Sequence, residues 1–398
     1  MTADALAAAL RQPGAVLLDA PRPDADTGRR GALLFAAPRQ ELAATAYAEV
    51  DGLLDAVETA VAGGAFVAGA LAYEAAYALE PARFPMPPRP DPTVPLGWFG
   101  VYDAPAEVPA ETVDAAAGGP APDLRDVRFA LDRGDYTERI ETVRRHIREG
   151  DVYQVNLTAP FRFRLDGDPL GLYAALRRRQ SVAYGAFLRL PGAAVASVSP
   201  ELFFRIDPDG GARTVTARPM KGTAPRGRTD ADDRRLAAAL AASPKDRAEN
   251  LMIVDLLRND LARVSEAGSV RVPRLFEAER YETVTQMTST VTARLRADVG
   301  VGGALRALFP CGSVTGAPKL RAMEVIRGVE VGPRGVYCGA IGYAAPDGTA
   351  AFSVPIRTAV VAGGAGRYDV GSGVVWDSTA EAEYDECLLK ARVLTELT

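Results

Sequence analysis

Residues 216–260 read TARPMKGTAPRGRTDADDRRLAAALAASPKDRAENLMIVDLLRND, and the organisation of the chain follows from this stretch. The residues at 214–217 predict a strand, which Arg218-Pro219 ends because proline donates no hydrogen bond to a sheet. Residues 220–223 then predict a tight, glycine-containing connection that carries Lys221. A possible nucleophile therefore directly precedes a helix that carries carboxylates.

That helix is predicted from about Pro244 to Val264 by apolar residues at helical spacing. The apolar positions expected on one face are Leu251, Val254, Leu257 and Leu261. Asp246 and Glu249 are three residues apart near the N-terminal turn, where acidic residues also stabilise the helix dipole. From spacing alone, a structural role and a ligand role for these two carboxylates both stay open.

Composition excludes several classes of protein. The 398 residues are 48% hydrophobic and carry a formal net charge of −5, with arginines spread along the chain, so a nucleic-acid partner is not expected. No run approaches the roughly 20 apolar residues of a membrane span, and no cleaved leader is expected at the N-terminus. Three cysteines far apart in sequence argue against a disulfide framework and suit the reducing cytoplasm.

His146 is the single histidine, and it falls within a predicted helix whose other face is charged. A position at the surface or at the helix end is favoured for it. A Ser-His-Asp or Cys-His catalytic arrangement would have to recruit this residue, and a zinc site would lack its commonest ligands. Catalysis is therefore expected to depend on carboxylates, lysines, hydroxyls or a hard metal ion.

The segment 103–126 is rich in Ala, Pro, Gly and acids without a periodic apolar face, and it predicts an exposed linker. After it, residues 152–165 predict a strand with polar groups at regular spacing, which can face a cleft. Pro200 interrupts a later strand pair beside Glu201, and from local sequence a simple turn residue is the more probable interpretation of this carboxylate.

Two C-terminal segments carry further signals. Residues 308–326 combine a Gly/Ser/Thr loop with a helix that begins at Pro318, an arrangement that can hold an anion but lacks the spacing of a nucleotide P-loop. Gly371-Ser372-Gly373 permits close approach of the backbone to a ligand. A terminal helix is predicted with Ser378 and Glu381 in capping-box spacing, and its side chains Glu383, Glu386 and Lys390 share one face. By spacing alone, that face is a solvated, salt-bridged surface.

Several segments across about 136–397, taken in order, carry a resemblance to a known family. They are GDVYQVNL, SPELFF, RPMKGTAPRG, AENLMIVDLLRNDL, FPCGSVTGAPK, YCGAIGY, IRT, GSGVVWDS and EAEYDECLLKA. In this ordered set the chain resembles the chorismate-utilising enzymes, which include the large subunits of anthranilate synthase and aminodeoxychorismate synthase, with isochorismate and salicylate synthases. The resemblance implies an α+β, anthranilate synthase component I-like fold of two large, mainly antiparallel sheets packed together with helices outside. Residues 1–125 would be a variable N-terminal region in the same body, and 126–398 the chorismate-binding catalytic region.

The same resemblance implies the site residues. Mg²⁺ would be bound by Glu249, Glu383 and Glu386, because hard oxygen ligands suit this ion. Asp246 would support these ligands without binding the ion directly. Glu201 would be the general acid that protonates the departing C4 hydroxyl of chorismate, and Lys221 the nucleophile. The implied substrate-binding residues are Gln154, Gly222, Thr223, Thr315, Tyr337, Arg357, Gly371, Gly373 and Lys390.

Two positions distinguish activities within this family. Isochorismate and salicylate synthases have a water-activating lysine where this chain has Gln154, and anthranilate synthases have alanine where it has Lys221. The pattern matches aminodeoxychorismate synthases and implies amination of chorismate at C4, a step of p-aminobenzoate and folate biosynthesis, through a lysine-linked intermediate. No glutaminase segment is visible, so ammonia is expected from a separate glutamine amidotransferase subunit.

Two alternatives stay open. The first is synthesis of anthranilate or 2-amino-2-deoxyisochorismate by an enzyme of the same family. The second is a catalytically silent chorismate-binding subunit, because Gln286 replaces a histidine that many relatives have in this segment.

Overall fold

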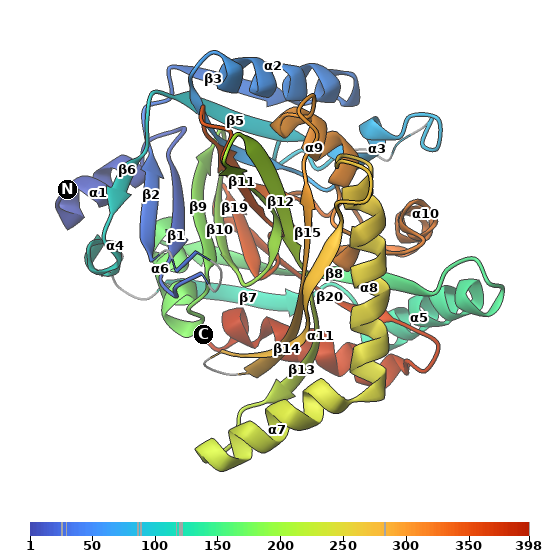
Figure 1. Cartoon of the computed structure of the whole chain (residues 1–398). Helices are drawn as coiled ribbons and strands as arrows, with labels where there is room; N and C mark the ends of the chain where they lie inside the picture. Colours follow the sequence, from blue (N-terminus) through green and yellow to red (C-terminus); the bar gives the residue numbers. More distant parts are fainter. Residues whose placement is uncertain are drawn as a thin grey trace.

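Two large antiparallel sheets form the centre of the computed structural model, and helices lie around their outside (Figure 1). The structure describes residues 1–24, 27–28, 30–85, 87, 90–116, 118, 122–281 and 284–397. The predicted α+β architecture with two mainly antiparallel sheets is confirmed.

The first sheet has the strand order β16-β8-β20-β19-β10-β9-β1-β2-β6, with β7 paired to β8. Its strands are β1 (Val16–Ala20), β2 (Gly31–Phe35), β6 (Ala106–Val108), β7 (Asp123–Phe129), β8 (Gln154–Asp166), β9 (Tyr184–Leu190), β10 (Ala193–Ser199), β16 (Gly316–Ala317), β19 (Thr358–Ala362) and β20 (Ala365–Val374). Strand β8 is buried on both faces up to Phe161 and then alternates, because its first part crosses the interior and its last part reaches solvent.

The second sheet has the order β13-β15-β12-β11-β18-β17-β4-β5-β3, with β14 paired to β15. Its strands are β3 (Gln40–Ala44), β4 (Phe66–Leu71), β5 (Gly97–Tyr102), β11 (Leu202–Asp209), β12 (Ala212–Arg218), β13 (Met220–Pro225), β14 (Arg271–Arg280), β15 (Val284–Arg294), β17 (Ala340–Ala344) and β18 (Ala350–Ser353). N-terminal strands extend both sheets, so the region 1–125 contributes to the same body as the rest of the chain.

The helices are α1 (Ala3–Leu10), α2 (Val50–Ala62), α3 (Ala75–Leu79), α4 (Ala110–Ala116), α5 (Arg133–Arg148), α6 (Pro169–Arg179), α7 (Asp230–Ala242), α8 (Pro244–Ala262), α9 (Val301–Leu308), α10 (Lys319–Val329) and α11 (Ala380–Thr395), with 3-10 turns at Tyr47–Glu49 and Gly312–Val314. Long helix α8 runs beside β15 at the right of Figure 1, and α7 extends away from the body below it. No helix in the described ranges is both long enough and apolar enough to cross a bilayer.

Apolar side chains of both sheets meet in the interior. One buried cluster joins Leu188 and Val195 of the first sheet with Trp98 and Ile341 of the second. Each such side chain contributes about 1.5–3 kcal/mol when it is removed from water, so this interface stabilises the packing of the two sheets. The site described below depends on that packing, because its residues come from both sheets.

Two of the crossings of the chain between the sheets are neighbours. The chain passes from β10 to β11 at Pro200-Glu201, and it returns from β18 to β19 through 354–357. The two crossings are joined, because Val354 N donates to the carbonyl oxygen of Glu201 at 3.1 Å and Ser199 Oγ donates to that of Val354 at 2.5 Å. Glu201 is therefore held between the sheets and is more than a surface turn residue.

Several local predictions are wrong in detail. Residues 220–223 form the start of strand β13 instead of a free connection, because they pair with β15. Thr379, not Ser378, caps α11, and Leu251 is 45% exposed although it was expected on the buried face of α8. Pro318 is the N-cap of α10 and precedes its first residue.

The predicted linker 103–126 is not a single exposed excursion. It contains β6, α4 and the start of β7, while positions 117 and 119–121 of this predicted linker lie outside the described residues. Val108 and Val113 are buried because β6 pairs with β2 and α4 packs against α1.

Candidate active site

Glu201 is the buried acid of the site. Its side chain belongs to a residue only 3% exposed, and its Oε1 atom has no hydrogen-bond partner among the described residues. Burial raises the pKa of Glu201 to about 7, although a hydrogen bond from the Ser313 hydroxyl and the charges of Lys221 and Lys390 oppose this rise. A carboxyl group in this state can donate a proton near neutral pH.

Lys221 lies on β13 beside this acid. The register of β13 against β15 shifts between Met220 and Thr223, and Gly222 has a φ of +90°, a left-handed conformation that glycine tolerates. Burial lowers the pKa of Lys221, and the charge of Lys390 lowers it further, while nearby carboxylates oppose the change. The amine is thereby moved toward the neutral form that a nucleophile needs.

Gly373 brings β20 against both Lys221 and Gln154. A Cβ atom built on Gly373 would lie 3.2 Å from Lys221 Nζ and 2.7 Å from Gln154 Nε2. The amide Oε1 and Nε2 atoms of Gln154 are buried, and neither has a hydrogen-bond partner in the described structure. An unpaired buried amide beside a lysine is costly unless a ligand binds it, so this is the expected position of a polar substrate.

Two helices contribute carboxylates near Lys221. Glu249 comes from α8, whose N-cap Ser243 accepts a hydrogen bond from Asp246 N, and Glu383 and Glu386 come from α11. Lys390, one turn beyond Glu386, lies 2.5 Å from Glu386 Oε1 and donates to the carbonyl oxygen of Gly371 at 2.8 Å. On the predicted face of α11, Glu383 is therefore buried, whereas the side chains of Glu386 and Lys390 remain 45% and 32% exposed.

The charges of these carboxylates act on one another. Burial raises the pKa of Glu249, and Asp246 and Glu383 add to the rise while Lys221 opposes it. Burial alone would also raise the pKa of Glu386, but the ion pair with Lys390 brings it below its ordinary value. Carboxylates of this kind would suit a hard divalent cation, whose charge would offset their repulsion, but within the described ranges the oxygens of Glu249, Glu383 and Glu386 do not all lie within 4.8 Å of one another.

The other predicted substrate-binding residues lie in several different segments of the chain. Thr315 is fully buried, and its hydroxyl donates to the carbonyl oxygen of Cys311 at 3.2 Å. Tyr337 is buried just before Cys338, which has a φ of +61°. Arg357 is at the second sheet crossing, and its Nη1 atom donates to Gln180 Oε1 at 3.3 Å. Thr223 is exposed and pairs with Gln286 of β15, so the described contacts do not join it to Lys221.

Three residues in the site were not identified from the sequence. Ser313 donates to Glu201, and Lys245 acts electrostatically on both Glu249 and Glu386. Arg334 is buried behind the loop that contains Thr315. Ser313 lies within the Gly/Ser/Thr loop and was accessible to sequence reasoning, whereas the other two are ordinary charged residues until the fold places them.

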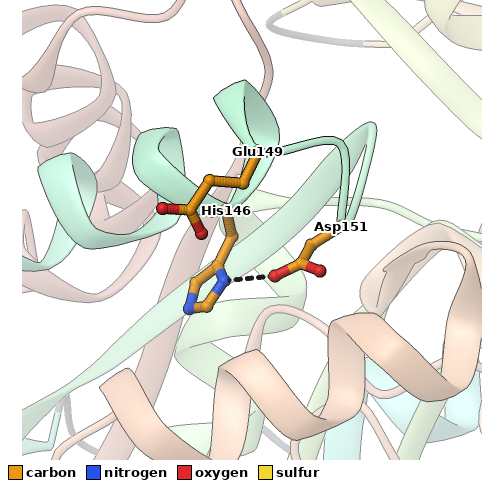
Figure 2. A group of neighbouring side chains, drawn as sticks. All are labelled: His146, Glu149 and Asp151. Carbon is orange, nitrogen blue, oxygen red and sulfur yellow. Dashed lines mark hydrogen bonds and ion pairs between the residues drawn. The ribbon is translucent and has the colours of Figure 1, made fainter.

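Possible metal ligands whose atoms do lie close together occur elsewhere, at the end of α5. Within the described ranges, His146, Glu149 and Asp151 bring their ligand atoms within 4.8 Å of one another (Figure 2). Asp151 Oδ2 already accepts from His146 Nδ1 at 2.7 Å and from Arg321 Nη2 at 2.5 Å. These donors lower the pKa of Asp151, and a guanidinium so close repels a cation. The group therefore joins α5 to α10, and the predicted helix-end position of His146 is confirmed.

The two-sheet fold thus brings a buried acid, a lysine and several carboxylates into one region of the molecule. The model of the chorismate binding enzyme family matches residues 15–396, and the chain belongs to this family.

An aminodeoxychorismate synthase of Streptomyces pristinaespiralis is 50% identical over 267 residues, which are 67% of this chain and 37% of that protein. Aminodeoxychorismate synthase component 1 of Escherichia coli (strain K12) is 43% identical over 68% of this chain and 59% of its own length. The matched part of the chain thus spans about two fifths to three fifths of the length of these relatives.

Among solved structures, anthranilate synthase component I from Streptococcus pneumoniae TIGR4 superimposes with a TM-score of 0.73 at 26% identity. The match covers 97% of this chain and 91% of that one. The expected fold is confirmed by this similarity, which extends through the N-terminal region.

Proposed function

We propose that this chain is the chorismate-aminating component of an aminodeoxychorismate synthase and makes 4-amino-4-deoxychorismate from chorismate and ammonia. The observation that carries the proposal is the position of Lys221, whose amine lies beside Gly373 and the unpaired Gln154 amide. Two relatives that bear this synthase name are 43–50% identical over most of the chain.

In the first step, the neutral amine of Lys221 attacks C2 of chorismate. The C2–N bond forms, the two conjugated ring double bonds shift, and the C4–O bond breaks. Glu201 gives its proton to the departing hydroxyl, which leaves as water. Burial favours both required forms, because it raises the pKa of Glu201 and lowers that of Lys221.

In the second step, ammonia attacks C4, the two double bonds shift back, and the C2–N bond to Lys221 breaks. The electron pair returns to the lysine nitrogen, which leaves as the neutral amine, and the proton lost by the incoming ammonia restores the acid form of Glu201. Gln154 has an amide where a water-activating base would be needed for hydroxylation. The site therefore favours a nitrogen nucleophile that needs no base.

Mg²⁺ is the proposed metal, bound by Glu249, Glu383 and Glu386. When bound, it would hold and neutralise the ring carboxylate of chorismate. The remaining substrate contacts are proposed for Gln154, Lys390 and the backbones of Gly371 and Gly373, with Gly222, Thr223, Thr315, Tyr337 and Arg357 around the rest of the ligand. Lys390 is well suited because it is already held between Glu386 and β20.

Ammonia is proposed to come from a separate glutamine amidotransferase, and the protein is proposed to act in the cytoplasm in p-aminobenzoate and folate biosynthesis. The Escherichia coli relative is named as a component 1, which supports a partner subunit. The single histidine, His146, is bound to Asp151 at the end of α5 and is remote in sequence from every cysteine. It therefore offers no support for a glutaminase centre within this chain.

The test incubates the protein with chorismate, Mg²⁺ and ammonium, and then adds the lyase that completes p-aminobenzoate. Formation of p-aminobenzoate is expected. Fluorescent anthranilate without p-aminobenzoate would instead identify the C2-aminating alternative, and absence of any turnover would favour a silent chorismate-binding subunit.

Mass spectrometry of the acid-quenched reaction without ammonium tests the mechanism. The lysines of the chain are Lys221, Lys245, Lys319 and Lys390, so the modified peptide can be assigned directly. A chorismate-derived adduct is expected on Lys221 and absent from Lys221→Ala. An adduct on Lys390 or another lysine would overturn the assignment of the nucleophile.

A further inference from the structure

Strand β8 has a break in its pairing beside the site. On one edge, β8 pairs continuously with β20, which places Asn156 and Thr158 opposite Gly373 and Gly371. On the other edge, β16 pairs with Gln154 and Val155, and β7 pairs from Phe161 onward. The backbone groups at 156–158 on this second edge are buried between the two neighbours and need other partners.

Arg334 and Glu330 supply those partners with their side chains. Arg334 Nη2 donates to the carbonyl oxygen of Asn156 at 2.7 Å. Glu330 Oε1 accepts from both the backbone N–H and the hydroxyl of Thr158 at 2.9 Å. The two side chains bind each other through Nη2–Oε1 at 2.7 Å and Nε–Oε2 at 3.0 Å, a two-point contact that fixes their orientation. The ion pair therefore replaces a missing length of strand.

The same guanidinium reaches a second segment of the site. Arg334 Nη1 donates to the carbonyl oxygen of Val314 at 2.7 Å, directly before Thr315. The Thr315 carbonyl in turn accepts from Asn156 N at 2.8 Å, so the loop and β8 are joined twice. Arg334 thus connects the loop of Thr315 to the strand of Gln154.

Tyr73 and Glu74 also hold the Arg334–Glu330 pair in place. The side chains of Arg334 and Glu330 are 1% and 5% exposed, and the guanidinium lies 4.4 Å from the ring centroid of Tyr73. The carboxylate of Glu74 accepts from the backbone N–H groups of Arg334 and Gly335 at 2.6 and 3.0 Å. This anchors the chain that leads, three residues after Arg334, to Tyr337.

We propose that the buried Arg334–Glu330 pair is a positioning element that sets the spacing of three substrate-facing segments: β8 with Gln154, the loop with Thr315, and the turn before Tyr337. It touches none of the reacting atoms. Its importance for binding follows from geometry, because displacements of about 1 Å in an active site can reduce rates roughly a hundredfold. A buried ion pair by itself adds little stability compared with apolar packing, so its retention in the core needs another reason.

Arg334→Lys is the decisive variant, since lysine keeps the charge but loses the planar fork that reaches two carbonyl oxygens and Glu330 together. The matched control is Arg177→Lys. Arg177 is also buried, at 5% side-chain exposure, and pairs with the fully buried Asp19 and with Asp114, neither of which is a proposed site residue. Each variant loses one buried guanidinium group. The melting temperatures of both variants are measured first.

Binding of chorismate in the presence of Mg²⁺ is then measured by calorimetry at a temperature where both variants are folded. We expect at least a tenfold weaker affinity for Arg334→Lys and less than a twofold change for Arg177→Lys. The role of the pair in amination rests on the proposed function, but this binding measurement does not. A wild-type protein that binds chorismate without aminating it would refute the proposed function and leave the positioning test intact.

Wild-type affinity in Arg334→Lys, or an equal loss in both variants, would overturn the proposal. If Arg334→Lys does not fold, the neutral isosteric change Glu330→Gln is compared with Asp19→Asn in the same way. Glu330→Gln places an amide N–H group against Arg334 and should weaken chorismate binding at least fivefold, and equal effects of the two amide variants would contradict the role.

Discussion

The amine of Lys221 lies so close to Gly373 that a Cβ atom there would be 3.2 Å from Lys221 Nζ. The lysine reaches this position from the second sheet, and the glycine belongs to the first. The proposed nucleophile and the backbone that faces the substrate are therefore aligned by the packing of the two sheets.

Replacing Gly373 by alanine tests this close approach. The new methyl group would lie 2.7 Å from Gln154 Nε2 and would displace both that amide and Lys221. We expect kcat/KM for chorismate to fall by about a hundredfold or more, which steady-state kinetics with ammonium measures. Gly328→Ala is the control, because Gly328 is exposed in α10 with no atom near its Cβ position. Normal activity in Gly373→Ala would show that the lysine is not held at this point.

The pH dependence of kcat/KM follows from two groups. Glu201 acts while protonated and has a pKa of about 7, so activity should decline as the pH rises above that value. Lys221 acts while neutral, and its lowered pKa places the opposite decline on the acidic side. A bell-shaped profile is expected. Glu201→Gln should lower the rate and remove the decline at high pH, whereas an unchanged alkaline limb in this variant would assign that limb to another group.

The carboxylates of α11 should differ sharply in their effect on the metal. Glu383→Gln removes a proposed ligand and should raise the Mg²⁺ concentration for half-maximal activity at least tenfold. Asp385→Asn is the control on the same helix, since Asp385 is exposed and pairs with Arg133. Titration of metal-free protein with Mg²⁺ measures both. Equal responses would remove Glu383 from the ligand set.

The two faces of α8 should differ in stability. Leu257 is 3% exposed and Leu251 is 45% exposed. Leu257→Ala should lower the free energy of unfolding by about 2–5 kcal/mol because it leaves a cavity, and Leu251→Ala should change it by less than about 1 kcal/mol. Chemical denaturation of both variants checks this. A larger loss in Leu251→Ala would mean that this side chain is covered in the protein in solution.

Local pattern left most of the proposed site residues as ordinary structural or surface groups, and the family resemblance assigned them roles. Helical spacing alone placed Glu383, Glu386 and Lys390 on one face of α11 and favoured a solvated surface, whereas Glu383 is buried there. Spacing describes which residues share a face, and the rest of the fold decides what that face meets. The same limit applies to Leu251, which was assigned to the buried face with Val254 and Leu257, although six residues separate it from Leu257 and α8 turns it outward.

Strand pairing caused the other errors. Residues 220–223 contain the glycine and neighbouring proline typical of a turn, but pairing with β15 holds them as the start of β13. Gly222 absorbs the irregularity at φ +90°, so a turn-forming residue serves here as a bulge in a strand. Long-range hydrogen bonds outweighed the local preference.

The sequence by itself determined which residue types could perform the chemistry: one histidine, unpaired cysteines, and a lysine and carboxylates in specific motifs. Only the tertiary structure decided that Lys221 lies beside both Glu201 and Gly373, because the packing of the two sheets brings Gly373 next to a residue more than 150 positions earlier in the chain. The tertiary structure also decided that Arg334 and Glu330 form a buried ion pair and bind the backbone groups of β8 that no neighbouring strand pairs. Burial supplies the physical reason in both cases, since removal from water shifts the pKa values of the acid and the lysine and requires each backbone group to find a partner.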